Sequence, residues 1–248
     1  MSKCLIVTGG GRGIGAEVSR KAAKQGYSVC VNFHRDQTSA QKLVRELEKE
    51  GANALAYQAD VSQEEEVEAL FQTVEKDLGT PKALVNNAGI LDLQTRVDGM
   101  NAERIQRIFA VNVTGSFLCA REAVKRMSTK YGGKGGSIVN LSSGAAKYGS
   151  PGEYVDYAAS KAAIDTLTIG LAREVAEEGI RVNAVRPGFI DTEIHQSGGE
   201  PDRMERVRPL VPMKRVGQAE EVADAIMWLL SDKASYTTGT ILDVSGGR

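Results

Sequence analysis

Short apolar runs rich in Val, Ile and Leu alternate along this chain with longer stretches of helical periodicity, and this alternation constrains the fold more than any other feature. The predicted strands are Cys4–Gly9, Ser28–Phe33, Ala54–Val61, Ala83–Gly89, Gly136–Ser143, Ile180–Gly188 and Gly239–Val244. The predicted helices are Gly13–Gln25, Thr38–Glu50, Glu64–Leu78, Ala102–Lys130, Tyr154–Glu177 and Glu220–Leu230.

Seven apolar strands separated by helices predict a parallel sheet, because right-handed crossovers place helices on both faces and bury the strands completely. We therefore expect an α/β fold with a single-domain, Rossmann-type, doubly wound seven-stranded parallel sheet that covers residues 1–248. The stretch 191–216 contains two Gly, three Pro and many charges but little periodicity, so it is predicted to be a mobile loop.

The charge balance and the apolar segments exclude several classes of partner. Lys and Arg total 31 and Asp and Glu total 32, so the formal net charge is -1 and no global field would attract a nucleic acid. No apolar stretch reaches 18 residues and no export signal is recognised at the N-terminus, so we expect no membrane partner. The three cysteines are odd in number and widely spaced, which indicates reduced core residues and a cytoplasmic location.

The segment TGGGRGIG, Thr8 to Gly15, follows the first predicted strand and opens the first predicted helix. A phosphate placed there would meet the free amides of the helix and the positive end of its dipole. Glycines also make tight strand-to-helix turns, so the loop alone is a weak signal, and its position in a βαβ unit strengthens it. Gly9, Gly13 and Gly15 give the spacing G-x-x-x-G-x-G, whereas Gly11, Gly13 and Ala16 fit the usual dinucleotide fingerprint less distinctively.

Further motifs follow this loop in order along nearly the whole chain: Asn86–Gly89, Asn112, Ser142 with Ser143, the spacing Tyr157-x-x-x-Lys161, and Arg186–Gly188. Together with TGGGRGIG, this set resembles the short-chain dehydrogenase/reductase family. The run SPGEYVDYAASK and the SGGEP region resemble bacterial members labelled glucose-1-dehydrogenase-like, whose substrate is often unassigned.

The resemblance implies that Tyr157 is the acid/base of a hydride transfer. An ordinary tyrosine has a pKa of about 10, so a base near neutrality needs a positive charge nearby, and Lys161 on the same helix face would supply it. The alternative is an exposed Tyr/Lys pair without chemistry. Tyr154 lacks a lysine four residues later and is predicted to pack or to line the pocket.

Two further catalytic residues are implied by the resemblance. Ser143 would hydrogen-bond the substrate oxygen, although 13 residues separate it from Tyr157, one more than the family usually has. A turn at 150–152 is expected to absorb the additional residue. Asn112 would hold a water in a proton relay from Lys161, and its alternative is a helix amide that satisfies local backbone.

The resemblance also implies a set of cofactor contacts. Besides Tyr157 and Lys161 they are Gly9, Gly11, Arg12, Gly13, Ile14, Gly15, Phe33, His34, Arg35, Asp60, Val61, Asn87, Ala88, Gly89, Pro187, Gly188, Ile190 and Thr192. For Asn86 to Gly89, a structural role at the centre of the sheet is an equal alternative.

The residues after the second strand favour NADP(H) over NAD(H). An acidic side chain there would bind the ribose hydroxyls of NAD and repel a 2′-phosphate, but the family's acidic position falls on Phe33, followed by His34 and Arg35. Arg12 and Arg35 would bind the phosphate by charge-assisted hydrogen bonds. Asp36 is predicted to be a helix cap.

The expected function is that of an NADP-dependent oxidoreductase acting on a small-molecule carbonyl or alcohol. A non-catalytic dinucleotide-binding sensor or scaffold is the alternative. The loop 191–216, with 91–97 and 147–154, would set the substrate; Glu193, His195, Arg203 and Arg206 are better explained as solvated loop residues. The family resemblance implies a homotetramer that packs through the helical regions 102–130 and 154–177.

Overall fold

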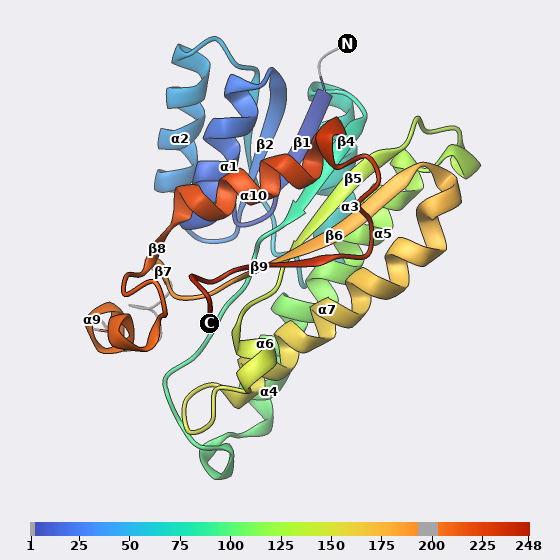
Figure 1. The fold of residues 1–248 in the computed structure, drawn as a ribbon. Coiled ribbons are helices and arrows are strands. Elements are labelled where there is room, and N and C mark those ends of the chain that lie inside the picture. Colours follow the sequence, from blue (N-terminus) through green and yellow to red (C-terminus); the bar gives the residue numbers. More distant parts are fainter. Residues whose placement is uncertain (1–2, 193–202) are drawn as a thin grey trace.

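The computed structural model describes residues 3–192 and 203–248, and its central feature is a seven-stranded parallel sheet (Figure 1). The strands are β1 Lys3–Val7, β2 Tyr27–Phe33, β3 Ala54–Gln58, β4 Pro81–Asn86, β5 Gly136–Leu141, β6 Ile180–Pro187 and β9 Ile241–Val244. Their order is β3-β2-β1-β4-β5-β6-β9, and every neighbouring pair is parallel. The predicted doubly wound, Rossmann-type α/β fold is confirmed.

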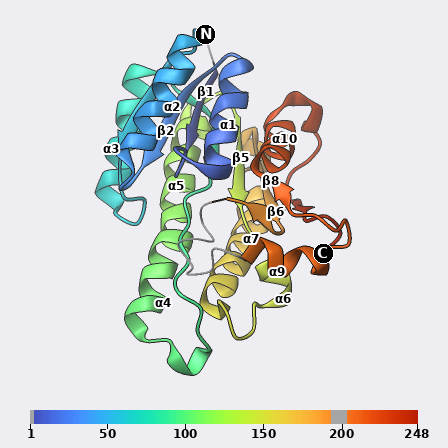
Figure 2. The same cartoon turned by 90° about the vertical axis from the view of Figure 1, so that its left-hand side faces the viewer.

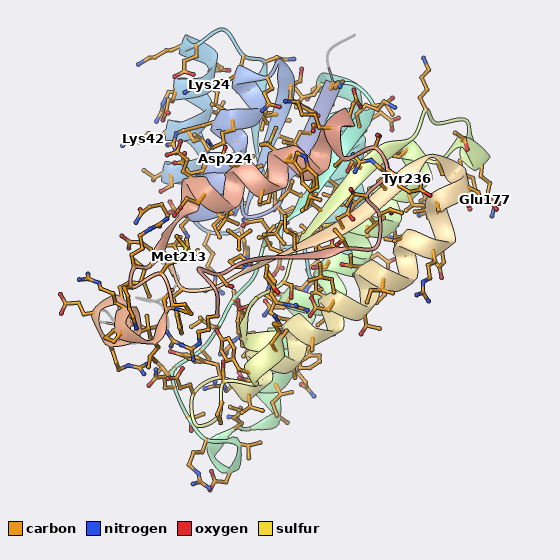
Figure 3. All side chains as sticks on the ribbon, viewed as in Figure 1. Lys24, Lys42, Glu177, Met213, Asp224 and Tyr236 are labelled. Carbon is orange, nitrogen blue, oxygen red and sulfur yellow. The ribbon has the colours of Figure 1, made fainter. Side chains whose placement is uncertain are left out.

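Helices cover both faces of this sheet (Figures 1 and 2). One face carries α1 Gly13–Lys24, α2 Gln37–Lys49 and α10 Ala219–Leu230, and the other carries α3 Glu64–Asp77, α5 Gly115–Met127 and α7 Val155–Val175. Charged side chains such as those of Lys24, Lys42 and Asp224 lie on the exposed side of the first layer (Figure 3). Each helix therefore buries one face against the sheet.

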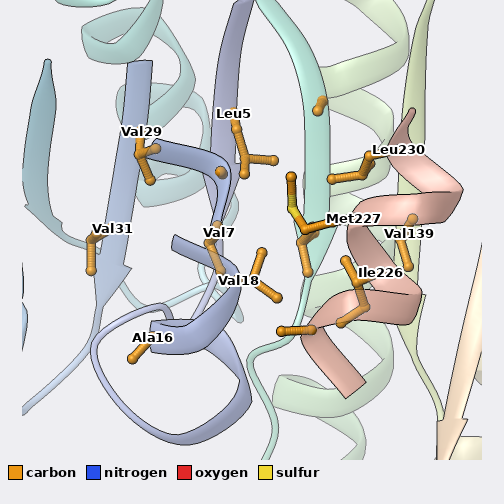
Figure 4. Close-up of a cluster of buried hydrophobic side chains, with 14 of the residues drawn as sticks. Leu5, Val7, Ala16, Val18, Val29, Val31, Val139, Ile226, Met227 and Leu230 are labelled. Atoms are coloured by element: carbon orange, nitrogen blue, oxygen red, sulfur yellow. The ribbon is translucent and has the colours of Figure 1, made fainter. Parts of the chain in front are cut away.

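Two hydrophobic clusters fill the spaces between the sheet and the helix layers. The first contains Val7 of β1, Val18 of α1 and Ile226 of α10, which point toward one another (Figure 4). All seven residues of β2 are buried, which explains why its sequence does not alternate regularly between apolar and polar residues. Cys4, Cys30 and Cys119 are buried and form no disulfide, as the sequence predicted.

The order of the strands reverses between β1 and β4, which lie side by side. At such a point the loops after the two strands turn to opposite sides and leave a crevice at their carboxyl ends, where ligands of doubly wound folds bind. The loops concerned are those that begin at Thr8 and at Asn87. No helix in the described part of the chain has the length and apolar character needed to cross a bilayer.

Several elements differ from the prediction. The region expected as one helix from Ala102 to Lys130 is α4 Ala102–Phe109, a π-helical turn Ala110–Thr114 and α5, stacked end to end (Figure 2). The sequence predicted neither α6 Ala145–Tyr148, nor α9 Arg203–Val207, nor the small sheet of β7 Ile190–Asp191 with β8 Gly217–Gln218. These elements have two to five residues, too few for a periodic pattern.

The segment 191–216, expected to be loop, thus contains α9 and a 3-10 turn, Arg208–Leu210, in its described part. Residues 193–202 of that segment lie outside the described residues. Immediately before α7, Gly149, Ser150 and Gly152 all have positive φ, so a tight turn lies where the additional residue after Ser143 was expected.

Candidate active site

The glycine loop wraps tightly over the end of β1. Gly9 and Gly13 have φ of +60° and +51°, a conformation that other residues rarely adopt. A Cβ on Gly15 would lie 2.6 Å from both Nδ2 of Asn87 and the carbonyl oxygen of Gly9. Among the described residues no side chain caps the start of α1, so its first amides have no side-chain acceptor. The loop can therefore admit a phosphate close to the backbone.

Asn87 fastens this loop to the segment that follows β4. Its Nδ2 donates to the carbonyl oxygens of Thr8 and Gly9, each at 2.9 Å, and the amides of Asn87 and Ala88 donate to Oγ1 of Thr8, each at 3.0 Å. Asn86 points the other way, into the core, where its Nδ2 donates to Oδ1 of Asn140 at 2.9 Å. Neighbouring asparagines thus have different environments, which the sequence did not distinguish.

Asn112 lies in the π-helical turn and is completely buried. Its Oδ1 accepts from the amide of Ile90 at 2.8 Å, and its Nδ2 donates to the carbonyl of Ile90 at 2.9 Å and to Oγ of Ser160 at 3.0 Å. Ser160 in turn donates to the carbonyl of Tyr157 at 2.7 Å. The amide therefore connects the segment after β4 to α7. Single π-helical turns often occur at functional sites.

Tyr157 and Lys161 lie on one face of α7, as their spacing predicted, and both line one cleft with Ser143. Nζ of Lys161 is 5.7 Å from the centre of the Tyr157 ring and donates to the carbonyl of Leu141 at 2.7 Å. Ser143 lines the cleft with Tyr157, and its hydroxyl acts to lower the pKa of the phenol. Ser142 instead donates to the carbonyl of Lys161 at 3.2 Å, so Ser143 is the better placed of the two serines.

Burial shifts both titratable groups away from their charged forms. It raises the pKa of Tyr157 to about 12, although the hydroxyl of Ser143 acts in the opposite direction. It also lowers the pKa of Lys161 to about 8, against the charge of Asp165. From the sequence we expect Lys161 to lower the pKa of Tyr157. In the structure this pKa is raised instead, because the desolvation of the phenol outweighs the nearby positive charges.

The residues predicted to contact the adenosine lie at or just after the ends of β2 and β3. Phe33 is buried, while His34 and Arg35 are exposed, as is Arg12 of the glycine loop. Nε2 of His34 is 3.6 Å from Oδ2 of Asp60. Asp36 caps α2, as predicted: its Oδ1 accepts from the amide of Ser39 at 3.0 Å, and this bond lowers its pKa, with a smaller contribution from the charge of Arg12.

The predicted residues divide between the cleft and its surroundings. Those that line the cleft are Ile14, Asn87, Gly89, Ser143, Tyr157, Lys161, Pro187, Gly188, Ile190 and Thr192. Phe33, His34, Arg35, Asp60 and Val61 lie at the ends of β2 and β3, and Asn112 is buried behind Gly89. A Cβ on Gly89 would lie 3.3 Å from Nζ of Lys161 and 3.5 Å from Oδ1 of Asn112, so glycine keeps these groups close.

Aromatic and cationic side chains outside the proposed catalytic and cofactor-binding sets also line the cleft. Tyr154 lines it, as expected, and is accompanied by Tyr148 and Phe189. Arg203 was expected to be solvated, but it is buried: its Nη2 is 2.7 Å from Glu153, and its guanidinium carbon is 4.9 Å from the centre of the Tyr154 ring. Its helix, α9, had no sequence signal.

Of the other three candidates for substrate contact, one lies among the described residues. Arg206 is exposed and also pairs with Glu153, at 2.9 Å. Glu193 and His195 lie outside the described residues.

Comparison with known proteins gives similarity along the whole chain. A family model described as enoyl-(acyl carrier protein) reductase matches residues 9–248. The chain is 57% identical to an uncharacterized oxidoreductase, YgfF, of Escherichia coli, over 98% of each chain. It is 41% identical to 3beta-hydroxysteroid dehydrogenase 1 of Eggerthella lenta, over 99% of this chain and 93% of that one. It is 38% identical to glucose 1-dehydrogenase 2 of Bacillus subtilis, over 99% and 94%. The names share a reaction type but not a substrate.

Proposed function

The chain belongs to the short-chain dehydrogenase/reductase family, and from this we propose that it is an NADP(H)-dependent oxidoreductase that interconverts a carbonyl group and a secondary alcohol. The observation that carries the proposal is that Ser143, Tyr157 and Lys161 line one cleft, with Lys161 one helical turn beyond Tyr157. A nicotinamide would supply or accept the hydride. The chain's own residues supply the proton and orient the substrate oxygen.

In the direction of reduction, Tyr157 donates its proton to the carbonyl oxygen while the carbon receives the hydride. Ser143 donates a hydrogen bond to the same oxygen and stabilises the negative charge that develops there. The raised pKa of Tyr157 keeps its hydroxyl protonated at neutral pH, as an acid requires. Oxidation of an alcohol needs the phenolate, which the charges of Lys161 and of an oxidised nicotinamide would stabilise.

Lys161 and Asn112 would return the proton to Tyr157. Both approach Gly89 closely, and Asn112 is fixed by three hydrogen bonds to Ile90 and Ser160. We propose that a water held near Asn112 passes a proton to the amine of Lys161, from which the proton of Tyr157 is restored. The bonds of Asn112 to backbone and to Ser160 also agree with its alternative role as a structural amide.

The glycine loop supports dinucleotide binding, because Gly9 and Gly13 adopt a positive φ, Gly15 packs against Asn87 without room for a Cβ, and no described side chain caps the first amides of α1. The predicted contacts at the ends of β2 and β3 would hold the adenosine, and those of 187–192 would hold the nicotinamide.

Residues 1–248 would act as one dinucleotide-binding and catalytic domain, with 191–216 as its substrate segment. A reducing compartment, the cytoplasm, agrees with three free cysteines.

The preference for NADP(H) rests on Arg12 and Arg35, which are exposed at the adenine end, while Asp36 is engaged in capping α2. Arg35→Glu should lower kcat/KM for NADPH by about 10-fold or more, because a charge-assisted hydrogen bond to phosphate is lost and a repulsion is added, and it should spare NADH. Lys42→Glu, on the exposed side of α2, is the matched control (Figure 3). Equal changes with both cofactors would contradict the preference.

Turnover of a carbonyl compound distinguishes the proposed oxidoreductase from a dinucleotide-binding sensor or scaffold. Wild-type protein with NADPH, and then NADH, is tested against a panel of ketones, sugars and diketones by the loss of nicotinamide absorbance. We expect consumption with at least one carbonyl, and Tyr157→Phe should lower kcat by about 10²- to 10⁴-fold while NADPH still binds. Binding of NADPH without consumption of any carbonyl would favour the sensor or scaffold, and a wild-type rate for Tyr157→Phe would overturn the assigned acid.

A further inference from the structure

Arg104 of α4 is a buried cation that connects three segments beside Tyr157. Its Nε donates to Oδ2 of Asp156 at 2.6 Å and its Nη2 to Oδ1 of the same carboxylate at 3.3 Å. Its Nη1 donates to the carbonyl of Leu93 at 2.5 Å. One guanidinium therefore holds α4, the first turn of α7 and the segment after β4 together.

Asp156 transmits this arrangement directly to the proposed acid. It precedes Tyr157 in the chain, and its Oδ1 accepts the backbone amide of Tyr157 at 2.9 Å. It lies in the first turn of α7, where the helix dipole favours a negative charge. The carboxylate is thus bound on one side by Arg104 and on the other by the residue whose hydroxyl faces the cleft.

We propose that Arg104 and Asp156 are a positioning pair that fixes Tyr157, and with it the wall of the cleft that includes Leu91, for hydride transfer. The proposal rests on the proposed function, because it requires Tyr157 to be the acid. Neither member of the pair lines the cleft, so both would act through the tyrosine they hold and not on the substrate.

The burial of the pair distinguishes it from ordinary surface charges. The side chains of Arg104 and Asp156 are 10% and 2% exposed. Such a pair keeps a defined geometry, since removing one partner leaves the other charge buried and unpaired. A bidentate arginine also fixes the angle between two helices, which a lysine, as a point charge, does not.

A second arginine of α4, which also contacts the segment after β4, provides a control for Arg104. Arg107, one turn further along α4, pairs with Asp92, the residue before Leu93, but its side chain is 50% exposed. Exposed pairs of this kind contribute little, because water screens the charges and both side chains lose freedom. Arg107 and Arg104 therefore share helix, charge and the segment they contact, and differ in burial and in the contact with Asp156.

The experiment compares Arg104→Met, Arg104→Lys and Arg107→Met with the wild type. It uses the carbonyl compound turned over fastest in the panel and measures kcat at saturating NADPH, the Kd for NADPH by fluorescence, and hydrogen exchange of the peptide that contains Tyr157. The charged and titratable groups that face the hydroxyl of Tyr157, namely Lys161 on α7, Tyr148 on α6 and Arg203 on α9, remain unchanged in every variant.

Arg104→Met should lower kcat by about 10- to 100-fold, as expected for a misplaced reacting group, with the Kd for NADPH within about twofold of wild type and faster exchange around Tyr157. Arg104→Lys should lose about threefold to tenfold, because it keeps the charge but not all three bonds. Arg107→Met should match the wild type. If Arg104→Met does not fold, Arg104→Lys provides the same test.

A folded Arg104 variant with wild-type kcat would overturn the proposal, and so would equal losses in kcat and in NADPH affinity, which indicate a general loss of structure. Tyr157→Phe separates this outcome from failure of the proposed function. If Tyr157→Phe keeps the wild-type rate, the proposed function fails. If it loses activity while the Arg104 variants do not, only the positioning pair fails.

Discussion

Lys161 is a cation in a place where water is largely excluded. Its side chain runs along α7 into the cleft, its amine donates to the carbonyl of Leu141, and burial lowers its pKa to about 8 from an ordinary 10.5. Asp165, one turn further on, opposes this effect and is itself held by Arg186 at 2.6 Å. At neutral pH the lysine therefore remains mostly protonated, as its proposed role requires.

The lowered pKa of Lys161 predicts how stability depends on pH. Between pH 8 and 10.5 the unfolded chain keeps this proton and the folded chain loses it, so the free energy of unfolding gains from this group as pH rises through the interval. In Lys161→Met this gain is absent. The difference in unfolding free energy, wild type minus variant, should grow by about 3 kcal/mol across the interval.

Urea unfolding at pH 7, 8.5 and 10 measures this difference, and the other titrating groups cancel between the two proteins. A difference that stays constant with pH would show that the pKa of Lys161 is ordinary in the folded state.

At the scale of elements, α5 begins at a glycine because it crosses the segment after β3 very closely. A Cβ on Gly115 would lie 2.7 Å from Cγ2 of Val61 and 3.1 Å from its carbonyl oxygen. Val61 is buried and follows Asp60, and both are proposed to meet the adenine. The approach of one helix thus fixes a segment assigned to the cofactor.

Gly115→Ala should therefore lower the free energy of unfolding by about 1–3 kcal/mol, because the methyl group forces α5 away from Val61. The Kd for NADPH should rise, since Asp60 and Val61 move with the contact. Gly170→Ala in α7 is the control: apart from its own helix backbone, no atom of the described residues lies within 4 Å of the added methyl group, and the substitution should stabilise the helix by about 0.5–1 kcal/mol. Equal stability of the two variants would contradict the close approach.

At the scale of the whole molecule, the helices on one side of the sheet leave apolar side chains in contact with water. Phe117 on α5, Ile105 on α4 and Ile169 on α7 are 49%, 38% and 37% exposed. We propose that these helices form contacts between copies in a homotetramer. Apolar residues that a single sheet face does not need would then be covered.

Phe117→Glu should dissociate the proposed tetramer, because a carboxylate would be buried at the contact without a partner. Light scattering coupled to gel filtration measures the mass. Tyr131→Glu is the control, since Tyr131 is also aromatic and more exposed but lies in the turn beyond the end of α5. A wild-type protein that runs as a monomer, or a Phe117→Glu tetramer, would contradict this arrangement.

The sequence by itself determined the sheet and the outline of the site, because both depend on local patterns. Strands buried on two faces must be apolar throughout, so β2 and its neighbours were visible as runs, and long helices were visible through their period. Tyr157 and Lys161, four residues apart, had to share a helix face, and Asp36 before α2 had to be a cap. These features need only the residues next to them.

Only the tertiary structure decided which residues meet across the chain. α6 and α9 are too short to give a periodic signal. The sequence therefore placed Arg203 in a loop, whereas α9 holds it beside Tyr154. The sequence did not distinguish Asn86 from Asn87. In the structure the side chain of Asn86 points into the core and that of Asn87 contacts the glycine loop.

The pKa of Tyr157 depends on burial by several elements at once, and Arg104 meets Asp156 across 52 residues, so neither could be predicted from a local pattern.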